Sequence, residues 1–124
     1  MAENKMTFCY WNIRGLGARI RLLLEYLGLP YEEKFYTHEI RPKWFEEEKL
    51  ELIKKNPAIT LPYIMDGDNL ISESDACAIY IIHKSGKKEL LGRNADEQVA
   101  VATMMGVFKD LYRTYLSLIY GEHK

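Results

Sequence analysis

The first third of the chain combines two hydrophobic patterns, one typical of strands and one typical of a helix. Residues 7–11 are rich in β-branched and aromatic side chains, and residues 31–36 have a similar but more polar composition, so both predict strands. Between them, residues 18–27 carry apolar side chains at helical spacing, and Gly28 followed by Pro30 supplies a stop signal. The pattern predicts a β-α-β unit, whose two strands we expect to be parallel.

The middle of the chain combines a helical segment with a hairpin. Residues 44–54 are dominated by Glu, Lys and Leu, which are good helix formers, and they predict a short surface helix. Residues 61–65 and 70–72 have strand patterns, and the turn cluster at 66–69 predicts that they pair as an antiparallel hairpin. Parallel and antiparallel pairs would therefore share one sheet.

Two further helices are expected after the hairpin. Ser74 and Asp75 are residue types that cap helix N-termini, and the chain from there to about Lys84 is apolar nearly all round, which predicts a buried helix. A linker is expected at 86–95. Residues 96–120 contain no proline, and their apolar positions occupy more than one face, which predicts one long helix of about 36 Å.

The long helix has a consequence for domain organisation. A helix that is apolar on more than one face needs neighbours on two sides, and residues 1–85 supply only one of them. We therefore expect a folded domain at 1–85, a linker at 86–95, and at 96–124 the first helix of an all-α domain that is otherwise missing. Another protein chain could also cover this helix, in a homodimer or a larger assembly.

Composition and charge narrow the classes of partner. The chain has 124 residues, about one domain's worth, and its 48% hydrophobic and 28% charged residues are typical of a folded globular protein. Its 17 Lys and Arg nearly balance 18 Asp and Glu, and they form no basic run. Nucleic acid is therefore not an expected partner.

Neither a membrane segment nor a metal site is expected. The longest apolar run, residues 76–82, is far shorter than the roughly twenty residues of a spanning helix, and the polar start of the chain resembles no signal peptide. This predicts a cytoplasmic protein without membrane insertion. Cys9 and Cys77 are too far apart for a CxxC motif, and with the three histidines they have no zinc-ligand spacing, so we expect reduced, buried thiols.

Four short motifs narrow the function. The predicted order of strands and helices is that of a thioredoxin-like domain, but a fold alone does not give a function. Residues 10–16, Tyr-Trp-Asn-Ile-Arg-Gly-Leu, and residues 19–26 closely resemble the start of mu-class glutathione transferases, as do residues 61–64 and 73–76. The resemblance covers essentially the whole chain but only about the first half of a typical family member.

The resemblance implies both a fold and a ligand. The fold is α/β, a thioredoxin-like β-α-β-α-β-β-α domain with a mixed four-stranded sheet, followed by the long helix from the all-α domain. The ligand is glutathione, as co-substrate or as a bound stabiliser, and no metal is implied.

Tyr10 is the candidate catalytic residue. A thiol with a pKa of about 8.5 is mostly protonated at neutral pH, and a phenol that donates a hydrogen bond to sulfur favours the thiolate. Tyr10 is expected at the end of the first strand, ahead of a helix N-terminus, where ligands collect in open α/β sheets and the helix dipole favours anions. The resemblance implies that this position is the catalytic tyrosine, and that Trp11 and Leu16 contact glutathione.

The resemblance also implies a cradle for the peptide. Leu61 and Pro62 match the family's cis-proline bond, which exposes the backbone of the preceding residue so that an extended peptide can pair with it. This would hold the cysteinyl unit of glutathione. Glu73 and Ser74 stand at a predicted helix start, where free N–H groups and the hydroxyl could bind the γ-glutamyl carboxylate.

Four further residues are implied less directly. Trp44 and Lys49 resemble the family's contacts to the glycyl end of glutathione. This chain has about three extra residues between Trp44 and Pro62, so that either Glu48 or Lys49 could stand where the family has its lysine. Asp110 resembles the aspartate that serves the neighbouring subunit's glutathione amine. Tyr120 resembles a second active-site tyrosine near the electrophile.

Two functions stay open at this point. In the first, the protein binds glutathione and, if active, transfers its thiolate to electrophilic small molecules. In the second, it is a non-catalytic structural subunit with a transferase-like fold, docked in a larger protein assembly. The missing part of the all-α domain, which builds most of the electrophile pocket in the family, leaves catalytic activity undecided.

Overall fold

The protein divides into two compact units in a computed structural model that describes residues 5–121. The division falls between Gly86 and Lys87. The outer ends of the two expected domains, residues 1–4 and 122–124, lie outside the described part of the chain.

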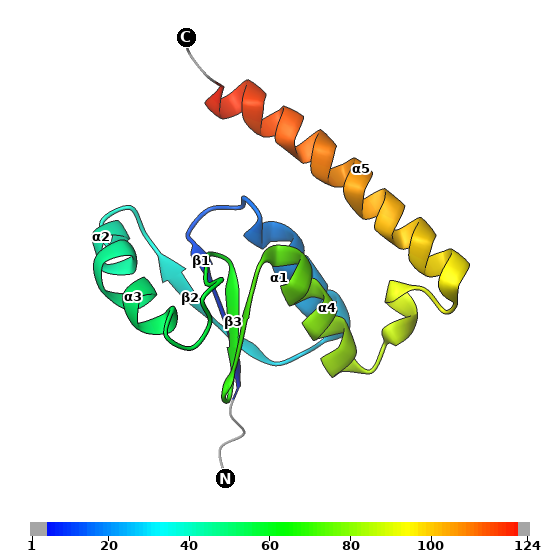
Figure 1. Cartoon of the computed structure of the whole chain (residues 1–124), viewed down its shortest axis with the longest axis horizontal. Coiled ribbons are helices and arrows are strands. Elements are labelled where there is room, and N and C mark those ends of the chain that lie inside the picture. Colours follow the sequence, from blue (N-terminus) through cyan, green and yellow to red (C-terminus); the bar gives the residue numbers. More distant parts are fainter. Residues whose placement is uncertain (1–4, 122–124) are drawn as a thin grey trace. The chain divides into compact units, whose positions relative to one another are not determined.

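A four-stranded sheet forms the centre of the first unit (Figure 1). Its strands are β1 (Met6–Trp11), β2 (Tyr31–Tyr36), β3 (Tyr63–Asp66) and β4 (Asn69–Ser72), in the spatial order β2-β1-β3-β4. The β1 and β2 strands are parallel, whereas β3 is antiparallel to both β1 and β4. This confirms the expected mixed sheet, including its parallel β-α-β unit and its hairpin.

Helices cover both faces of the sheet. The helices α1 (Gly17–Leu27) and α4 (Ser74–Ser85) pack together on one face. The other face carries α2 (Arg41–Lys43), the π-helical turn η1 (Trp44–Glu48) and α3 (Lys49–Leu52), as Figure 1 shows. Together these three elements form one continuous segment, called here the α2–α3 segment, which spans residues 41–52.

The alternation of side chains along β1 assigns its residues to these two faces. Phe8 and Tyr10 face α1, because the guanidinium carbon of Arg21 lies 5.5 Å and 5.9 Å from their ring centroids. Trp11 faces the α2–α3 segment, where its ring lies 6.1 Å from that of Phe45. The first unit therefore has two buried layers, one on each side of the sheet.

Periodic burial explains the two longer helices of this unit. In α1, Ile20 and Leu24 are fully buried and lie one turn apart, as the apolar spacing of the sequence predicts. In α4, Cys77 and Ile81 have the same spacing and are equally buried. Burial of each of the Ile and Leu side chains contributes about 1.5–3 kcal/mol by its removal from water.

The structure differs from the sequence prediction in one helix and in the start of one strand. Residues 44–54 do not form one regular helix, because the N–H of Lys49 bonds the carbonyl of Trp44 and closes a π-type turn within the α2–α3 segment. The β3 strand begins at Tyr63 rather than at Leu61, since the Leu61-Pro62 bond is cis and proline has no N–H for the ladder.

Both cysteines are free and fully buried, as expected. Burial raises the pKa of Cys9 to about 11 and that of Cys77 to about 12. Because only the thiolate reacts with disulfide reagents, we expect the native chain at pH 8 to react at least about 100-fold more slowly than free cysteine. Denaturation should release two reactive thiols, whereas one fast thiol in the native chain would contradict this burial.

The second unit contains a short 3₁₀ helix, η2 (Lys88–Leu91), and the long helix α5 (Ala95–Tyr120). The long helix was expected, but the 3₁₀ turn lies within a stretch that the sequence predicted as a linker. None of the residues of α5 is buried, and apolar side chains such as Val99, Phe108 and Leu111 are exposed along it. Within residues 5–121, no helix is both long and apolar enough to cross a membrane.

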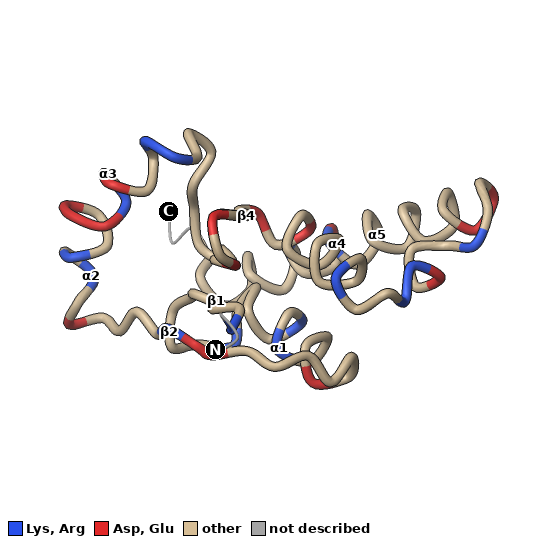
Figure 2. The backbone as a smooth tube through the Cα atoms, turned by 90° about the horizontal axis from the view of Figure 1, so that it is seen from below, with Lys and Arg blue, Asp and Glu red and all other residues tan. Residues whose placement is uncertain are grey.

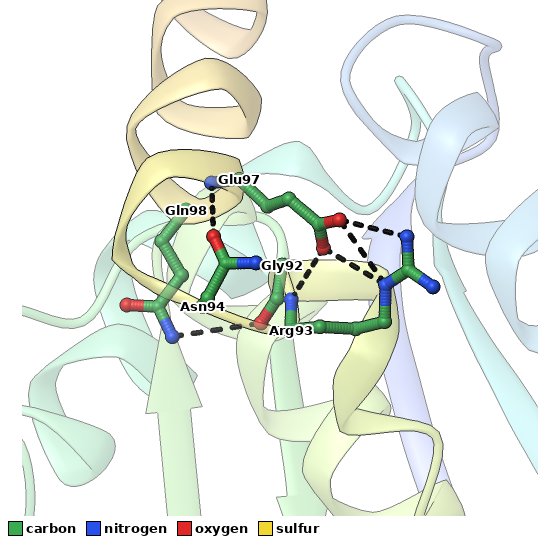
Figure 3. Close-up of polar contacts among 5 residues, drawn as sticks. All are labelled: Gly92, Arg93, Asn94, Glu97 and Gln98. Atoms are coloured by element: carbon green, nitrogen blue, oxygen red, sulfur yellow. Dashed lines mark hydrogen bonds and ion pairs between the residues drawn. The ribbon is translucent and has the colours of Figure 1, made fainter.

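A capping network starts α5 (Figure 3). The side chain of Asn94 accepts a hydrogen bond of 3.0 Å from the N–H of Glu97, whose carboxylate in turn accepts one of 2.7 Å from the N–H of Arg93. The Arg93 guanidinium also bonds that carboxylate at 2.7 Å, and the Gln98 amide donates to the carbonyl of Gly92 at 3.5 Å. The bond from Glu97 to Asn94 satisfies an N–H that a helix N-terminus leaves free, and the other bonds hold the residues before the cap, so that together they fix where α5 begins.

Candidate functional site

The sheet register brings the predicted site residues of the first unit to one end of the sheet. Cys9 pairs with Tyr63, and Tyr63 pairs with Ser72. Because β3 is antiparallel to both neighbours, its start lies beside the end of β1 and the end of β4. The end of β1, the Leu61-Pro62 bond and the start of α4 therefore share this end.

Tyr10 lies against the loop that leads into α1. Its Oη accepts a hydrogen bond of 3.0 Å from the N–H of Leu16. A Cβ at Gly15 would lie 2.5 Å from that oxygen, and a Cβ at Gly17 would lie 2.4 Å from the Cδ1 of Tyr10. The two glycines thus let the loop close over the ring.

The hydroxyl of Tyr10 keeps a proton that it can donate. The side chain is only 6% exposed, but the bond from Leu16 uses the oxygen as an acceptor. No acceptor for the hydroxyl proton occurs among the residues that the structure describes. A buried hydroxyl with an unused donor favours an incoming acceptor, because leaving the donor unpaired is costly.

The surroundings of this hydroxyl favour a negative charge. Leu16 is the N-cap residue of α1, so the positive end of the helix dipole lies at Tyr10. The first turn of α1 contains no acidic residue. An anion beside the Tyr10 hydroxyl would therefore be stabilised by both the hydrogen bond and the helix.

The backbone before Pro62 is available for pairing. The Leu61-Pro62 peptide bond is cis, as the resemblance implied. Thr60 is already paired, since its N–H donates to the Ser72 hydroxyl at 2.8 Å and its carbonyl accepts from that hydroxyl at 3.2 Å. The N–H and C=O of Leu61 have no partner within residues 5–121. An extended peptide could pair with them.

The start of α4 differs from the sequence prediction. Glu73 occupies the N-cap position, and its side chain makes no capping hydrogen bond. Its φ of 74° is positive, which is unusual for a residue other than glycine. The expectation that Ser74 and Asp75 act as caps was wrong, because the guanidinium of Arg19 binds the Ser74 hydroxyl and also lies 2.7 Å from Asp75 Oδ1. Strained backbone of this kind clusters at functional sites.

Arg19 is a residue that the sequence reasoning missed at this end of the sheet. It joins the first turn of α1 to the first turn of α4, and its Nε is buried without a hydrogen-bond partner in the described part of the chain. Its place inside the motif at residues 19–26 was the only signal, and the motif does not say that it would contact Ser74.

The two aromatic candidates on the other face have different surroundings. Trp44 is only 2% exposed, and its ring stacks on that of Tyr63 at 5.8 Å. Trp11 is half-buried, with its ring 6.1 Å from those of Tyr36 and Phe45. Trp44 therefore anchors the α2–α3 segment to the core, whereas Trp11 keeps part of its surface accessible.

The structure distinguishes Lys49 from Glu48. Glu48 bonds Lys34 and Tyr36, so its carboxylate is occupied. The ammonium of Lys49 makes no ion pair among residues 5–121, and its side chain is half-buried. The π turn adds one residue between Trp44 and Lys49, so that Lys49 lies one turn beyond Trp44. Of the two alternatives, Lys49 is the cation free to bind a carboxylate.

Asp110 and Tyr120 lie on α5, in the second unit, and both are exposed. Asp110 is 4.0 Å from Arg113, one turn along the same helix. Their expected roles toward a neighbouring subunit and an electrophile stay predictions. Among residues 5–121, no group of three or more His, Cys, Asp or Glu side chains has the arrangement of a metal site.

Comparisons with known proteins identify the family of the chain. A family model described as "Glutathione S-transferase, N-terminal domain" matches residues 6–83. The chain is 37% identical to the class-mu 26 kDa isozyme 51 of Fasciola hepatica, over 90% of the chain and 49% of that relative. It is 40% identical to human glutathione S-transferase Mu 2, over 93% of the chain and 52% of that relative.

Solved structures of related proteins have a similar fold. The structure of prostaglandin synthase D of Nilaparvata lugens matches with a TM-score of 0.72 and 28% identity, over 97% of this chain and 54% of that one. A Nu-class glutathione transferase from Haemonchus contortus matches with a TM-score of 0.66 and 27% identity, over 86% of this chain and 47% of that one. The chain spans about half the length of the curated relatives it matches. By family model, relatives and fold together, the chain belongs to the glutathione S-transferases and contains their N-terminal domain.

Proposed function

We propose that this protein binds glutathione and holds its sulfur as a thiolate, which then attacks an electrophilic small molecule. The observation that carries the proposal is the Tyr10 hydroxyl, which accepts from Leu16, keeps its own proton and lies at the start of α1. In the reaction, the thiol proton passes to solvent and the sulfur lone pair forms the new bond to carbon. The leaving group, or an activated double bond, takes up the displaced electron pair.

The stabilisation needed is within the reach of one hydroxyl. A hydrogen bond to a charged group contributes about 1.5–3 kcal/mol, which corresponds to about a tenfold to 150-fold increase in the ratio of thiolate to thiol. The N-terminal end of α1 adds to this effect. Since a free thiol with a pKa of about 8.5 is only a few per cent ionised at neutral pH, this increase raises the thiolate to between about a quarter and about four fifths of the bound sulfur.

The rest of the tripeptide would lie along the end of the sheet. The free N–H and C=O of Leu61 would pair with the cysteinyl unit as an added strand, with Pro62 fixing their direction. The γ-glutamyl carboxylate would bind at the start of α4, at Glu73 and Ser74, close to the positive charge of Arg19. Leu16 would contact the ligand from the loop before α1.

The glycyl end would lie beside the α2–α3 segment. Lys49 supplies the unpaired cation for its carboxylate, and Trp44 and Trp11 border that region from η1 and β1. The alternative function, a structural subunit without catalysis, has no support in the comparisons, since the curated relatives described above are named as glutathione S-transferases.

Proposals about the whole protein rest on α5. We expect another protein chain, in a homodimer or larger assembly, or the rest of an all-α domain, to cover its exposed apolar side chains. Asp110 would then serve the partner subunit's glutathione, and Tyr120 would lie near the electrophile. Detoxification of such electrophiles, in the cytoplasm, is the role that we propose for the assembled protein.

A binding experiment tests the proposal directly. We expect isothermal titration calorimetry to show binding of glutathione, and at least about tenfold weaker binding of cysteinylglycine, which lacks the carboxylate assigned to the start of α4. The chain should also catalyse conjugation of glutathione to a general chromogenic electrophile. Equal affinity for the two peptides would contradict the placement at Ser74, and failure to bind either would overturn the proposed function.

A further inference from the structure

A polar network ties the α2–α3 segment to the sheet. The Oε2 of Glu48 accepts hydrogen bonds from the hydroxyl of Tyr36 and, at 2.8 Å, from the ammonium of Lys34, and both partners are on β2. Its Oε1 lies 3.6 Å from the ammonium of Lys43, within the segment itself. The side chain of Glu48 is only 18% exposed, so this carboxylate is surrounded by its partners.

The network continues into the core. The hydroxyls of Tyr36 and Tyr63 are 2.9 Å apart, and both side chains are 1% exposed. Burial opposes the ionisation of Glu48, but hydrogen bonds from Lys34 and Tyr36 outweigh it and hold the pKa of this carboxyl below its ordinary value. Glu48 is therefore charged at neutral pH, in contact with two cations and a fixed hydroxyl.

Little else holds the segment in place. Neither α2 nor α3 contains a buried residue, and Trp44 is the buried residue of η1. A cavity of about 540 Å³ separates part of the segment from the sheet, with Glu48 and Leu52 on one side and Lys34, Tyr63 and Met65 on the other. Trp44 is therefore the one fully buried apolar anchor of the segment, beside the partly buried Leu52 and the contact of Phe45 with Trp11, and Glu48 is its polar anchor.

The neighbouring charges do not share this role. Figure 2 shows acidic and basic residues following one another along the segment. Glu46 and Glu47 are exposed, and within residues 5–121 neither makes a hydrogen bond or an ion pair. Glu48 thus differs from two chemically identical neighbours in being bonded to the sheet.

The position of Lys49 depends on both anchors. Its N–H closes the π turn on the carbonyl of Trp44, and it follows Glu48 directly in the chain. Two anchored side chains therefore fix the backbone of Lys49: the ring of Trp44, one turn earlier, and the carboxylate of Glu48, one residue earlier. Loss of the carboxylate would leave the turn held at one end only.

We infer that Glu48 is a positioning residue for glutathione, which holds the α2–α3 segment on β2 and thereby directs the ammonium of Lys49 to the glycyl carboxylate. The inference rests on the proposed function. It assigns to Glu48 an effect on one end of the ligand only, because Tyr10 lies on β1 and Leu61 directly precedes the cis bond to Pro62, and neither residue belongs to this segment.

Glu48→Gln tests the inference, because it keeps the size of the side chain and removes its charge. Calorimetry would compare glutathione with γ-glutamylcysteine, the same peptide without its glycine. We expect the variant to bind glutathione about tenfold more weakly and γ-glutamylcysteine within about twofold of the unmodified chain. In turnover, the KM for glutathione should rise by a similar factor while kcat stays nearly constant.

Glu47→Gln is the matched control, and it should leave both affinities unchanged. Tyr36→Phe removes one bond to Glu48 and keeps the ion pairs, so it should give a smaller loss of about threefold, again for glutathione alone. Should Glu48→Gln fail to fold, as judged by circular dichroism, the affinities of Tyr36→Phe for the two peptides test the inference instead.

Three results would overturn the inference in different ways. Unchanged glutathione affinity in the variants would show that Glu48 does not direct Lys49. An equal loss for both peptides would show a general structural role. Failure of the unmodified chain to bind glutathione would remove the proposed function, and the inference with it, whereas the first two results leave that function intact.

Discussion

Replacement of Tyr10 by phenylalanine is expected to lower kcat for conjugation by about 100-fold, which corresponds to a loss of about 2.7 kcal/mol of transition-state stabilisation. The aromatic ring stays in place against Gly17, but the hydroxyl that bonds Leu16 is lost. Without it, the sulfur would lose the hydrogen bond that favours the thiolate, and the thiol would return to its protonated form at neutral pH. The KM for glutathione should change little, because the peptide is held elsewhere.

Initial rates with a chromogenic electrophile measure this effect. Tyr31→Phe is the matched control, since it removes a phenol that bonds Glu25 at 2.9 Å and that belongs to β2. We expect the control to retain full activity. If Tyr10→Phe were as active as this control, the hydroxyl of Tyr10 would have no role in the reaction.

Gly15→Ala is expected to have the second large effect, on both stability and rate. A Cβ at this position would lie 2.5 Å from the oxygen of Tyr10, and the backbone has a φ of +39°. The positive φ costs about 1 kcal/mol in a residue with a side chain, and overpacking adds about 1–3 kcal/mol. Since the clash is with the reactive hydroxyl, kcat should also fall by about tenfold or more.

Gly67→Ala separates the two contributions. Gly67 has a φ of +58°, but a Cβ there would meet no atom within 4 Å. Denaturant unfolding should therefore show a loss of about 1 kcal/mol for Gly67→Ala and about 2–4 kcal/mol for Gly15→Ala, with kcat reduced only in the latter. Equal losses for the two variants, with full activity in both, would mean that the loop at Gly15 does not fix the hydroxyl.

Much of the fold was predictable from the sequence because its signals are local. The spacing of Ile20 and Leu24 predicts a one-sided helix, and both residues are buried in α1. The turn cluster at 66–69 predicts a hairpin, and β3 and β4 pair there. These signals depend only on neighbours in the chain, so no tertiary information is needed.

The α2–α3 segment was harder to predict for a physical reason. Its Glu, Lys and Leu residues favour any helical form, so composition does not distinguish an α turn from the π turn at Trp44–Glu48. The choice between Glu48 and Lys49 depended on Lys34 and Tyr36, which belong to β2 and are not neighbours in the chain. Only the folded structure shows that Glu48 is already bonded.

The start of α4 shows the same limit. Ser74 is a residue type that favours helix caps, but its hydroxyl bonds Arg19, which is 55 residues earlier in the chain. The resemblance indicated Tyr10 as the catalytic residue, yet the bond from Leu16 that orients its hydroxyl could not be read from the motif. The sequence therefore indicated which residues belong to the site, but only the folded structure shows which groups they form hydrogen bonds with.

The most direct test of the central claim is the ionisation of the bound sulfur. Ultraviolet absorbance of the thiolate, followed against pH in the complex of the chain with glutathione, gives the pKa of that thiol. We expect a midpoint at least about one pH unit below the solution value of about 8.5 for the unmodified chain, and a return toward that value in Tyr10→Phe. The same midpoint in both proteins would contradict the claim that the Tyr10 hydroxyl stabilises the thiolate.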